Sequence, residues 1–162
     1  GTGIHDLRRI SKKLEKNFGT GVKGQAALFK LTKPQSVQLF AETLHFIPHF
    51  DGTLAVGSTS ERSFDQEDTN DDNLQALMVK ASKILPELDG KDPIYTWANI
   101  RPRARSRAPI LGHHPLFPSE FIMNGGFKIG LGMAPRMGKI FAEFLVLNKD
   151  RIPAEFLPSA SL

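Results

Sequence analysis

The dipeptide Asp51-Gly52 stands between two apolar segments, and this arrangement leaves few folds open to the chain. Residues 38–50 (QLFAETLHFIPHF) and 53–59 (TLAVGST) are rich in the β-branched and aromatic residues typical of strands. An Asp-Gly pair between two such segments is typical of a β-hairpin, because glycine readily takes the positive φ that tight turns require. The chain is therefore predicted to contain an antiparallel sheet, to which residues 24–31 (GQAALFKL) add a further strand.

Three other segments repeat apolar residues at the spacing of a helix face: residues 6–18, 74–85 and 136–147. Gly19 is placed to end the first helix, and Pro135 is placed to begin the third. An acidic stretch precedes the second helix and offers Thr69, Asn70 or Asp71 as its N-cap. Helices are thus expected before, between and after the strands.

Three further strands or strand fragments are predicted at residues 93–104, 109–112 and 121–126. The order helix, strands, helix, strands, helix predicts the α+β class, with an antiparallel sheet covered by helices. The sequence has no G-x-G-x-x-G turn after a first strand and no P-loop, so it does not encode a complete dinucleotide fold.

The composition is that of an ordinary soluble globular domain, with 162 residues of which 40% are hydrophobic and 23% charged. No cysteine occurs, which excludes disulfides and thiolate metal sites and is compatible with a reducing cytoplasm. No apolar run approaches the roughly 20 residues that a membrane-spanning helix needs. The formal charge of +4 favours anionic partners, among which nucleic acid, a phosphate-bearing cofactor and a small carboxylate all stay open.

Arginines occupy four alternate positions of residues 99–112 (NIRPRARSRAPILG), namely Arg101, Arg103, Arg105 and Arg107. Alternate side chains of a strand point to the same face, so the row would present its guanidinium groups together. A solvated edge strand is the plainer explanation for the last three. Arg101 directly follows an apolar strand, where packing would hold its planar fork in position to bind a carboxylate in a two-pronged manner.

Four glycines, Gly125, Gly126, Gly130 and Gly132, bracket a short loop that leads from a strand to the helix expected near Pro135. Glycines let the main chain approach a flat ligand closely, and the free amides at a helix start supply partial positive charge. An ordinary tight turn before a helix would use the same residues.

Other catalytic arrangements find little support in the sequence. No G-x-S-x-G turn is present to expose a nucleophilic serine. His45 and His49 would lie about 13 Å apart on one strand, which is too far to share a metal ion.

Four sequence blocks resemble the second half of the glycine and D-amino-acid oxidase family of FAD-dependent oxidoreductases, in the same order and at similar spacing. They are VKGQ (22–25), HFIPHFDGTLAVGSTSE (45–61), WANIRPRARSRAPILG (97–112) and NGGFKIGLGMAP (124–135). The resemblance implies a substrate domain on an antiparallel sheet, followed by a strand, loop and helix that return to the flavin domain. It predicts three parts: a helical lead-in (1–22), a substrate-binding domain (23–108) and a flavin-contacting C-terminal part (109–162).

The resemblance also implies site residues. Arg101 matches the arginine that binds the substrate carboxylate, and it is predicted to be the catalytic residue. His45 and Lys128 join it as substrate-binding candidates, although relatives often have tyrosine at the first position and can have arginine at the second. The loop predicted to contact FAD consists of Gly126, Phe127, Lys128, Ile129, Gly130, Leu131 and Gly132.

The implied activity is hydride transfer to FAD from the amine-bearing carbon of a glycine-like or D-amino-acid substrate, which leaves an imine that hydrolyses to an oxo acid and ammonia. FAD would be held mainly by an N-terminal domain of the same protein that lies outside this chain, so the chain by itself is expected to be inactive. No metal, membrane span or nucleic-acid partner is predicted, and the cytoplasm is the expected location. The alternative is a non-catalytic module that binds an anion or RNA through the arginine row.

Overall fold

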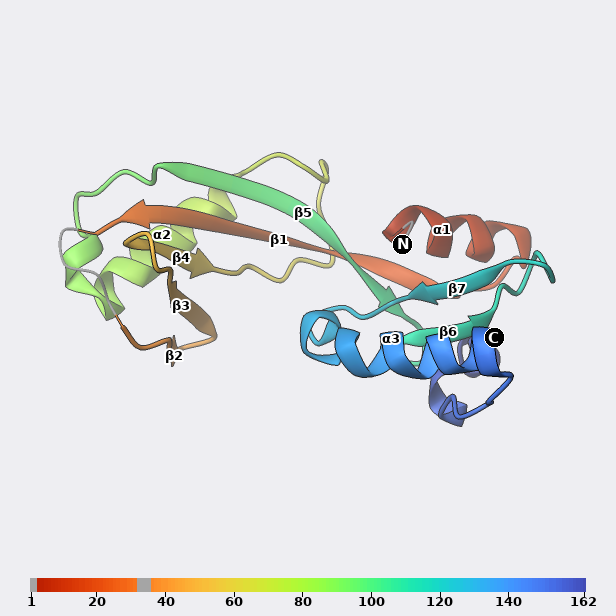
Figure 1. The fold of residues 1–162 in the computed structure, drawn as a ribbon. Coiled ribbons are helices and arrows are strands. Elements are labelled where there is room, and N and C mark those ends of the chain that lie inside the picture. Colours follow the sequence, from red (N-terminus) through yellow and green to blue (C-terminus); the bar gives the residue numbers. More distant parts are fainter. Residues whose placement is uncertain (1–2, 32–35) are drawn as a thin grey trace. The chain divides into compact units, whose positions relative to one another are not determined.

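The computed structural model describes residues 3–31 and 36–162 (Figure 1). Its main elements are α1 (Gly3–Lys13), β1 (Gly19–Lys30), β2 (Leu39–Ala41), β3 (Leu44–Pro48), β4 (Thr53–Gly57), α2 (Asp72–Ile84), β5 (Tyr95–Ala104), β6 (Ile110–His113), β7 (Phe121–Asn124) and α3 (Gly130–Leu147). Short 3₁₀ helices cover Pro86–Leu88, Ala154–Phe156 and Pro158–Ser161. The predicted α+β class is confirmed, with an antiparallel sheet accompanied by helices.

Contacts divide the chain into two compact units. The first unit comprises Gly1–Val22 and Arg101–Leu162, and the second unit comprises Lys23–Ile100. The strands β1 and β5 contribute residues to both units. The three-part division that the family resemblance implies stays a prediction.

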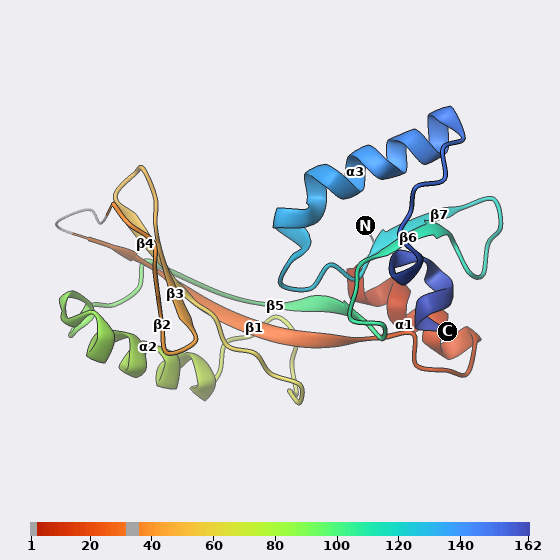
Figure 2. The ribbon, with the colours of Figure 1, turned by 90° about the horizontal axis from the view of Figure 1, so that it is seen from below.

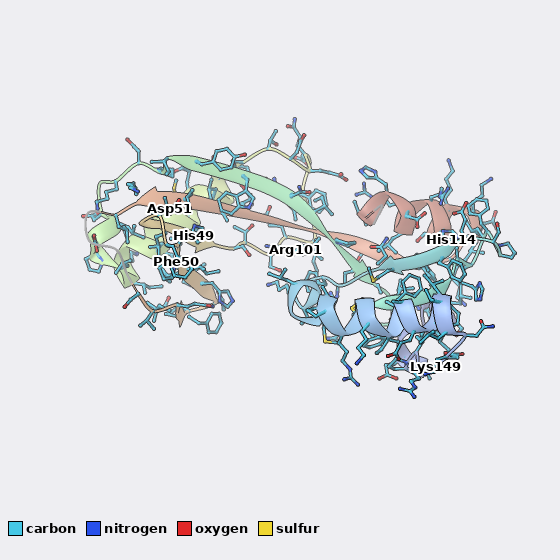
Figure 3. All side chains as sticks on the ribbon, in the orientation of Figure 1. His49, Phe50, Asp51, Arg101, His114 and Lys149 are labelled. Atoms are coloured by element: carbon cyan, nitrogen blue, oxygen red, sulfur yellow. The ribbon has the colours of Figure 1, made fainter. Side chains whose placement is uncertain are left out.

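The second unit is built on a sheet with the strand order β2-β3-β4-β1-β5. In this sheet β1 pairs with β4, β4 with β3 and β3 with β2, each time antiparallel. The predicted hairpin is confirmed: the His49 amide donates to the Thr53 carbonyl at 2.8 Å, and Gly52 takes a φ of 79°. The hairpin tip carries the side chains of His49, Phe50 and Asp51, which Figure 3 labels together.

The segment 38–50 forms two strands where one was predicted. β2 and β3 are joined at Glu42 and Thr43, which take positive φ angles of 46° and 72°. Two successive positive φ angles are the conformation of a type I′ hairpin turn, which asparagine, aspartate and glycine usually supply. Glutamate and threonine are not among these residues, so the sequence pattern does not indicate the turn.

The core of the second unit lies between α2 and one face of the strands β1, β3 and β4, as Figure 2 shows. Its buried residues are Ala27, Phe29, Leu31, Leu44, Phe46, Leu54, Val56, Leu74, Leu77, Ala81 and Leu88. The Asp71 side chain accepts a hydrogen bond from the Asn73 amide at 2.9 Å and caps α2. Asp71 is one of the three residues that were predicted as the N-cap of this helix.

In the first unit, α1 ends at Lys13, before the predicted end at Gly19. Glu15 takes a positive φ of 51°, which leads the chain out of the helix. Gly19 instead begins β1, where a Cβ would lie 2.8 Å from the carbonyl oxygen of Arg103. Glycine is therefore needed at this position for the close approach of two backbones.

α3 begins at Gly130, so Pro135 lies inside the helix that it was predicted to begin. The Met133 amide already donates to the Ile129 carbonyl at 3.0 Å, so residues of the glycine-rich stretch form the first turn. Pro135 is the sixth residue of α3 and lies beyond its first turn, so its missing N–H removes the hydrogen bond that would reach the Leu131 carbonyl.

The predicted apolar face of α3 packs only in part in the first unit, since Leu145 and Leu147 are 45% and 55% exposed. Met137 is buried with Leu111 of β6 and Ile152, and the side chains of Ile140, Phe141 and Phe144 pack against this cluster. Within residues 3–31 and 36–162, no helix combines the length and the apolar character that crossing a membrane requires.

Candidate functional site

The end of β5 pairs with the glycine-rich loop before α3, within the first unit. Arg103 forms an antiparallel bridge with Gly126, and the Phe127 amide donates a hydrogen bond to the Pro102 carbonyl at 3.1 Å. Arg101 directly precedes this pairing and is half-buried; Figure 3 labels its side chain. Two segments that are distant in the sequence therefore meet beside Arg101.

The loop follows a path that leaves no room for a side chain at two of its positions. Gly125 takes a φ of 72° and Phe127 a φ of 44°. A Cβ at Gly125 would lie 2.9 Å from the Cβ of Ala104, and a Cβ at Gly126 would lie 2.8 Å from the Cα of Gly130. Side chains at these two glycines would push the loop away from β5 or from the start of α3.

A cavity of about 300 Å³ opens beside this loop. Its walls belong to the first unit, and the described residues that line it carry no charged side chain: Gly3, Pro102, Met123, Asn124, Gly125, Gly126, Gly130, Ala134 and Met137. A Cβ at Gly130 would meet nothing within 4 Å, so the backbone there faces open space. The cavity presents bare peptide and apolar groups, which suits a flat, largely apolar ligand.

The start of α3 gives the same region partial positive charge. No side chain caps this helix end, and the first amides of a helix have no acceptor within the helix itself. Together with the helix dipole, these amides favour negative charge near Gly130 and Leu131.

Three cations gather near the loop. The Arg103 guanidinium carbon lies 5.4 Å from the centroid of the Phe127 ring, and the Lys128 Nζ lies 5.8 Å from it. Partial desolvation, and then the nearby positive charge of Arg101, lower the pKa of Lys128 below its usual value. The region beside Arg101 therefore carries positive charge from three side chains.

His45 lies in the second unit, on β3. Its cross-strand partner is Gly57 of β4, which is itself paired with Ala26 of β1. Side chains of directly paired residues lie on the same face of a sheet, so His45 stands beside a glycine and an alanine. The ring is exposed, lies 4.5 Å from the Phe40 ring centroid and has its Nδ1 3.3 Å from the Gln38 amide nitrogen.

The predicted site residues are distributed as follows. Arg101, Lys128 and the predicted flavin loop come together in the first unit, and His45 belongs to the second. Gly126, Phe127, Lys128 and Ile129 form the loop, while Gly130, Leu131 and Gly132 form the first turn of α3. Of the seven residues predicted to contact FAD, Gly126 and Gly130 line the cavity. The roles of all these residues toward substrate and cofactor stay predictions.

Asn124 is a buried residue of the site that the sequence pattern did not single out. Its side-chain amide donates to the Gly3 carbonyl at 2.8 Å, and its side-chain oxygen accepts from the Gly125 amide at 2.7 Å. Asn124 therefore fixes the start of the loop to the start of α1. Asparagine before two glycines indicates only a turn, and its partner at Gly3 is too distant in the sequence to be inferred.

The family model described as FAD dependent oxidoreductase matches residues 2–144 of the chain. The chain belongs to the FAD dependent oxidoreductase family. A glycine oxidase of Pseudomonas aeruginosa is 31% identical over 145 residues, which cover 87% of this chain and 39% of that protein. The family resemblance recognised from the four sequence blocks is thereby confirmed.

Solved structures of flavoenzymes share the fold. The glycine oxidase from Geobacillus kaustophilus aligns with a TM-score of 0.77 and 22% identity, covering 92% of this chain and 41% of that chain. The iminodiacetate oxidase from Chelativorans sp. BNC1 aligns with a TM-score of 0.74 and 23% identity, covering 87% of this chain and 40% of that chain. The chain spans about two fifths of the length of these relatives.

FAD is the cofactor of the family, and the residues beside the cavity fit one part of it. Bare backbone at Gly126 and Gly130 and the uncapped start of α3 match a flat ring system that carries negative charge when reduced. The cavity has about 300 Å³, which suits a portion of so large a cofactor.

Proposed function

We propose that this chain is the substrate-binding and flavin-contacting part of an FAD-dependent oxidoreductase that oxidises a glycine-like or D-amino-acid amine. The observation that carries the proposal is the pairing of β5 with the glycine-rich loop next to Arg101. This pairing puts a cation suited to a carboxylate beside backbone suited to a flavin. Membership of the family and the similarity to glycine oxidases support the proposal.

Arg101 binds the substrate carboxylate in this proposal. A guanidinium group offers two parallel N–H donors to a carboxylate, which fixes the direction of the acid as well as its position. Lys128 adds a second positive charge, and partial desolvation, followed by the nearby charge of Arg101, lowers its pKa. His45 is kept as a further substrate-binding candidate on the family resemblance; within the second unit it lies beside the small residues Gly57 and Ala26. A substrate held by its acid group presents its amine-bearing carbon in one orientation.

The loop and the first turn of α3 face the cofactor. FAD, when bound, supplies the acceptor for the hydride that leaves the amine-bearing carbon. Gly126 and Gly130 let the main chain approach the ring, and the free amides of α3 stabilise negative charge at its edge. An N-terminal domain of the same protein holds the rest of the cofactor, in keeping with the share of the relatives that this chain spans. A cytoplasmic location is part of the proposal, since cysteine is absent from the sequence.

The test is anaerobic mixing of the flavoprotein that contains this chain with candidate amines, while the flavin absorbance is recorded. We expect glycine, sarcosine or D-alanine to bleach the flavin and glycinamide to leave it oxidised, because the amide lacks the carboxylate that Arg101 binds. A protein that holds FAD but is bleached by no amine would contradict the proposed activity.

A further inference from the structure

Resting on the proposed function, we propose that Arg103 and Lys128 form a second anion subsite beside Arg101, which makes an amine with two carboxylates the preferred substrate. The pairing between β5 and the loop explains why these cations meet. Arg103 is bridged to Gly126, and Lys128 follows two residues later in the loop.

Arg101 and Arg103 address the same side of β5. Side chains two residues apart on a strand share a face, about 6.6 Å apart along the strand. Lys128 lies close enough to Arg101 to respond to its charge, and both Lys128 and Arg103 contact the Phe127 ring. The three cations therefore converge on one region and offer positions for two acid groups of one small molecule.

Arg103 and Lys128 lack an acidic partner within residues 3–31 and 36–162. Among the residues that the structure describes, no carboxylate oxygen lies within 4.0 Å of either side chain's nitrogen atoms. After partial desolvation, the positive charge of Arg101 is the second cause that lowers the pKa of Lys128, so an anion bound between these two cations would relieve their repulsion. The Phe127 ring contributes by cation–π contact, which holds both groups in place without neutralising them.

The other two arginines of the row differ in their surroundings. Arg105 and Arg107 are exposed, and Arg107 lies in a turn with a φ of 70°. Arg105 is the matched control for Arg103, because it carries the same charge on the same segment and is exposed to solvent.

D-aspartate and D-asparagine test the subsite, because they have nearly the same shape and differ in the second carboxylate. With the flavoprotein that contains this chain, we expect kcat/KM for D-aspartate to exceed that for D-asparagine about tenfold, the usual effect of a hydrogen bond to a charged group. Arg103→Gln and, separately, Lys128→Gln should remove most of this preference, while Arg105→Gln should retain it. A wild-type enzyme without the preference, or an equal loss in Arg105→Gln, would overturn the subsite.

An equilibrium measurement separates this inference from the proposed activity. Succinate and succinamate are titrated into the oxidised flavoprotein, and the flavin spectrum or the heat of binding is recorded. Tighter binding of succinate that Arg103→Gln abolishes supports the subsite even if no amine bleaches the flavin. Equal binding of the two acids overturns the subsite even if the protein proves to be an active oxidase.

Discussion

Arg101 is the residue on which the proposed substrate binding depends most. Replacing it with glutamine removes the charged two-pronged contact and keeps much of the side-chain length. We expect kcat/KM for the amine substrate to fall about 10- to 100-fold, mainly through KM, the range that corresponds to losing hydrogen bonds to a charged group. Steady-state kinetics of Arg101→Gln beside Arg105→Gln measures this. An unchanged KM for Arg101→Gln would exclude a role in binding the acid.

Gly126 tests the fit of the loop to the cofactor. A Cβ at this position would lie 2.8 Å from the Cα of Gly130, so Gly126→Ala must displace the loop or the first turn of α3. We expect the affinity for FAD to fall about tenfold, because displaced main chain no longer matches the ring edge. Fluorescence titration of the apoprotein with FAD measures the effect.

The control for Gly126→Ala is Gly138→Ala, since a Cβ at Gly138 meets nothing within 4 Å. FAD binding should be unchanged in this control. Equal affinities in Gly126→Ala and the wild-type protein would show that the loop does not face the cofactor.

At the scale of the elements, α3 carries a glycine that its helix does not need. Gly138 lies in the interior of the helix with open space around it. Alanine loses less conformational freedom than glycine on entering a helix, so Gly138→Ala should raise the free energy of unfolding by about 0.5–1 kcal/mol. Denaturant unfolding of Gly138→Ala and of the wild-type protein measures the difference. A less stable variant would contradict the prediction, because it would show that the added methyl group does not fit at this position.

The start of α2 is joined to β1 by a polar network in which the β1 side chains are buried and the Asp71 carboxylate is exposed. The Lys23 ammonium is 1% exposed and lies 2.7 Å from the Asp71 carboxylate, which also accepts from the Gln25 amide at 2.6 Å. Hydrogen bonds from Lys23, and then from Gln25, hold the pKa of Asp71 well below its ordinary value of 3.8. A carboxyl with a lowered folded-state pKa stabilises the fold above the unfolded value and loses this contribution as pH falls toward the folded value.

Asp71→Asn should therefore lower the melting temperature by several degrees at pH 7, where it leaves the Lys23 ammonium buried without a counter-charge. Asparagine preserves the N-cap, so the effect reports on the charge. The difference from the wild-type protein should shrink below about pH 4, because Asp71 then binds a proton in the unfolded chain. Melting curves from pH 7 to pH 3 test this, with the exposed Asp72→Asn as control. A difference that is constant with pH would contradict the assignment.

The elements show which features a sequence pattern can predict. Local periodicity and turn residues predict the hairpin at Asp51-Gly52, the helix α2 and the strands β5, β6 and β7. All of these elements are confirmed. The start of α3 was misplaced because glycine is a poor helix former, yet tertiary pairing of Phe127 with Pro102 fixes the chain where the helix begins. The turn at Glu42 and Thr43 uses positive φ angles that these residue types do not indicate.

The residues of the site also differ in whether a local sequence pattern can indicate them. Arg101 and the glycine-rich loop could be chosen from residue chemistry and the family resemblance. Their meeting depends on the bridge between Arg103 and Gly126, a long-range contact that no local pattern encodes. Asn124 and Pro102 were missed for this reason, since each acts through a partner distant in the sequence.

At the scale of the whole molecule, the chain spans about two fifths of its relatives and exposes apolar side chains on α3. Leu131 is 92% exposed and Val146 is 79% exposed. We expect the 162-residue chain by itself to bind FAD at least about 100-fold more weakly than the longer flavoprotein, because in the proposed function another domain holds most of the cofactor. Fluorescence titration of both proteins with FAD compares the affinities, and equal affinities would contradict this view.

The most direct test of the account is a crystal structure of the flavoprotein with FAD and glycolate, a carboxylate that resembles glycine. The quantity to measure is the distance from the Arg101 guanidinium nitrogens to the glycolate carboxylate oxygens. We expect two contacts of about 2.7–3.0 Å, with the loop Gly126–Gly132 against the flavin ring. A carboxylate bound elsewhere, or a loop that lies away from the flavin, would contradict it.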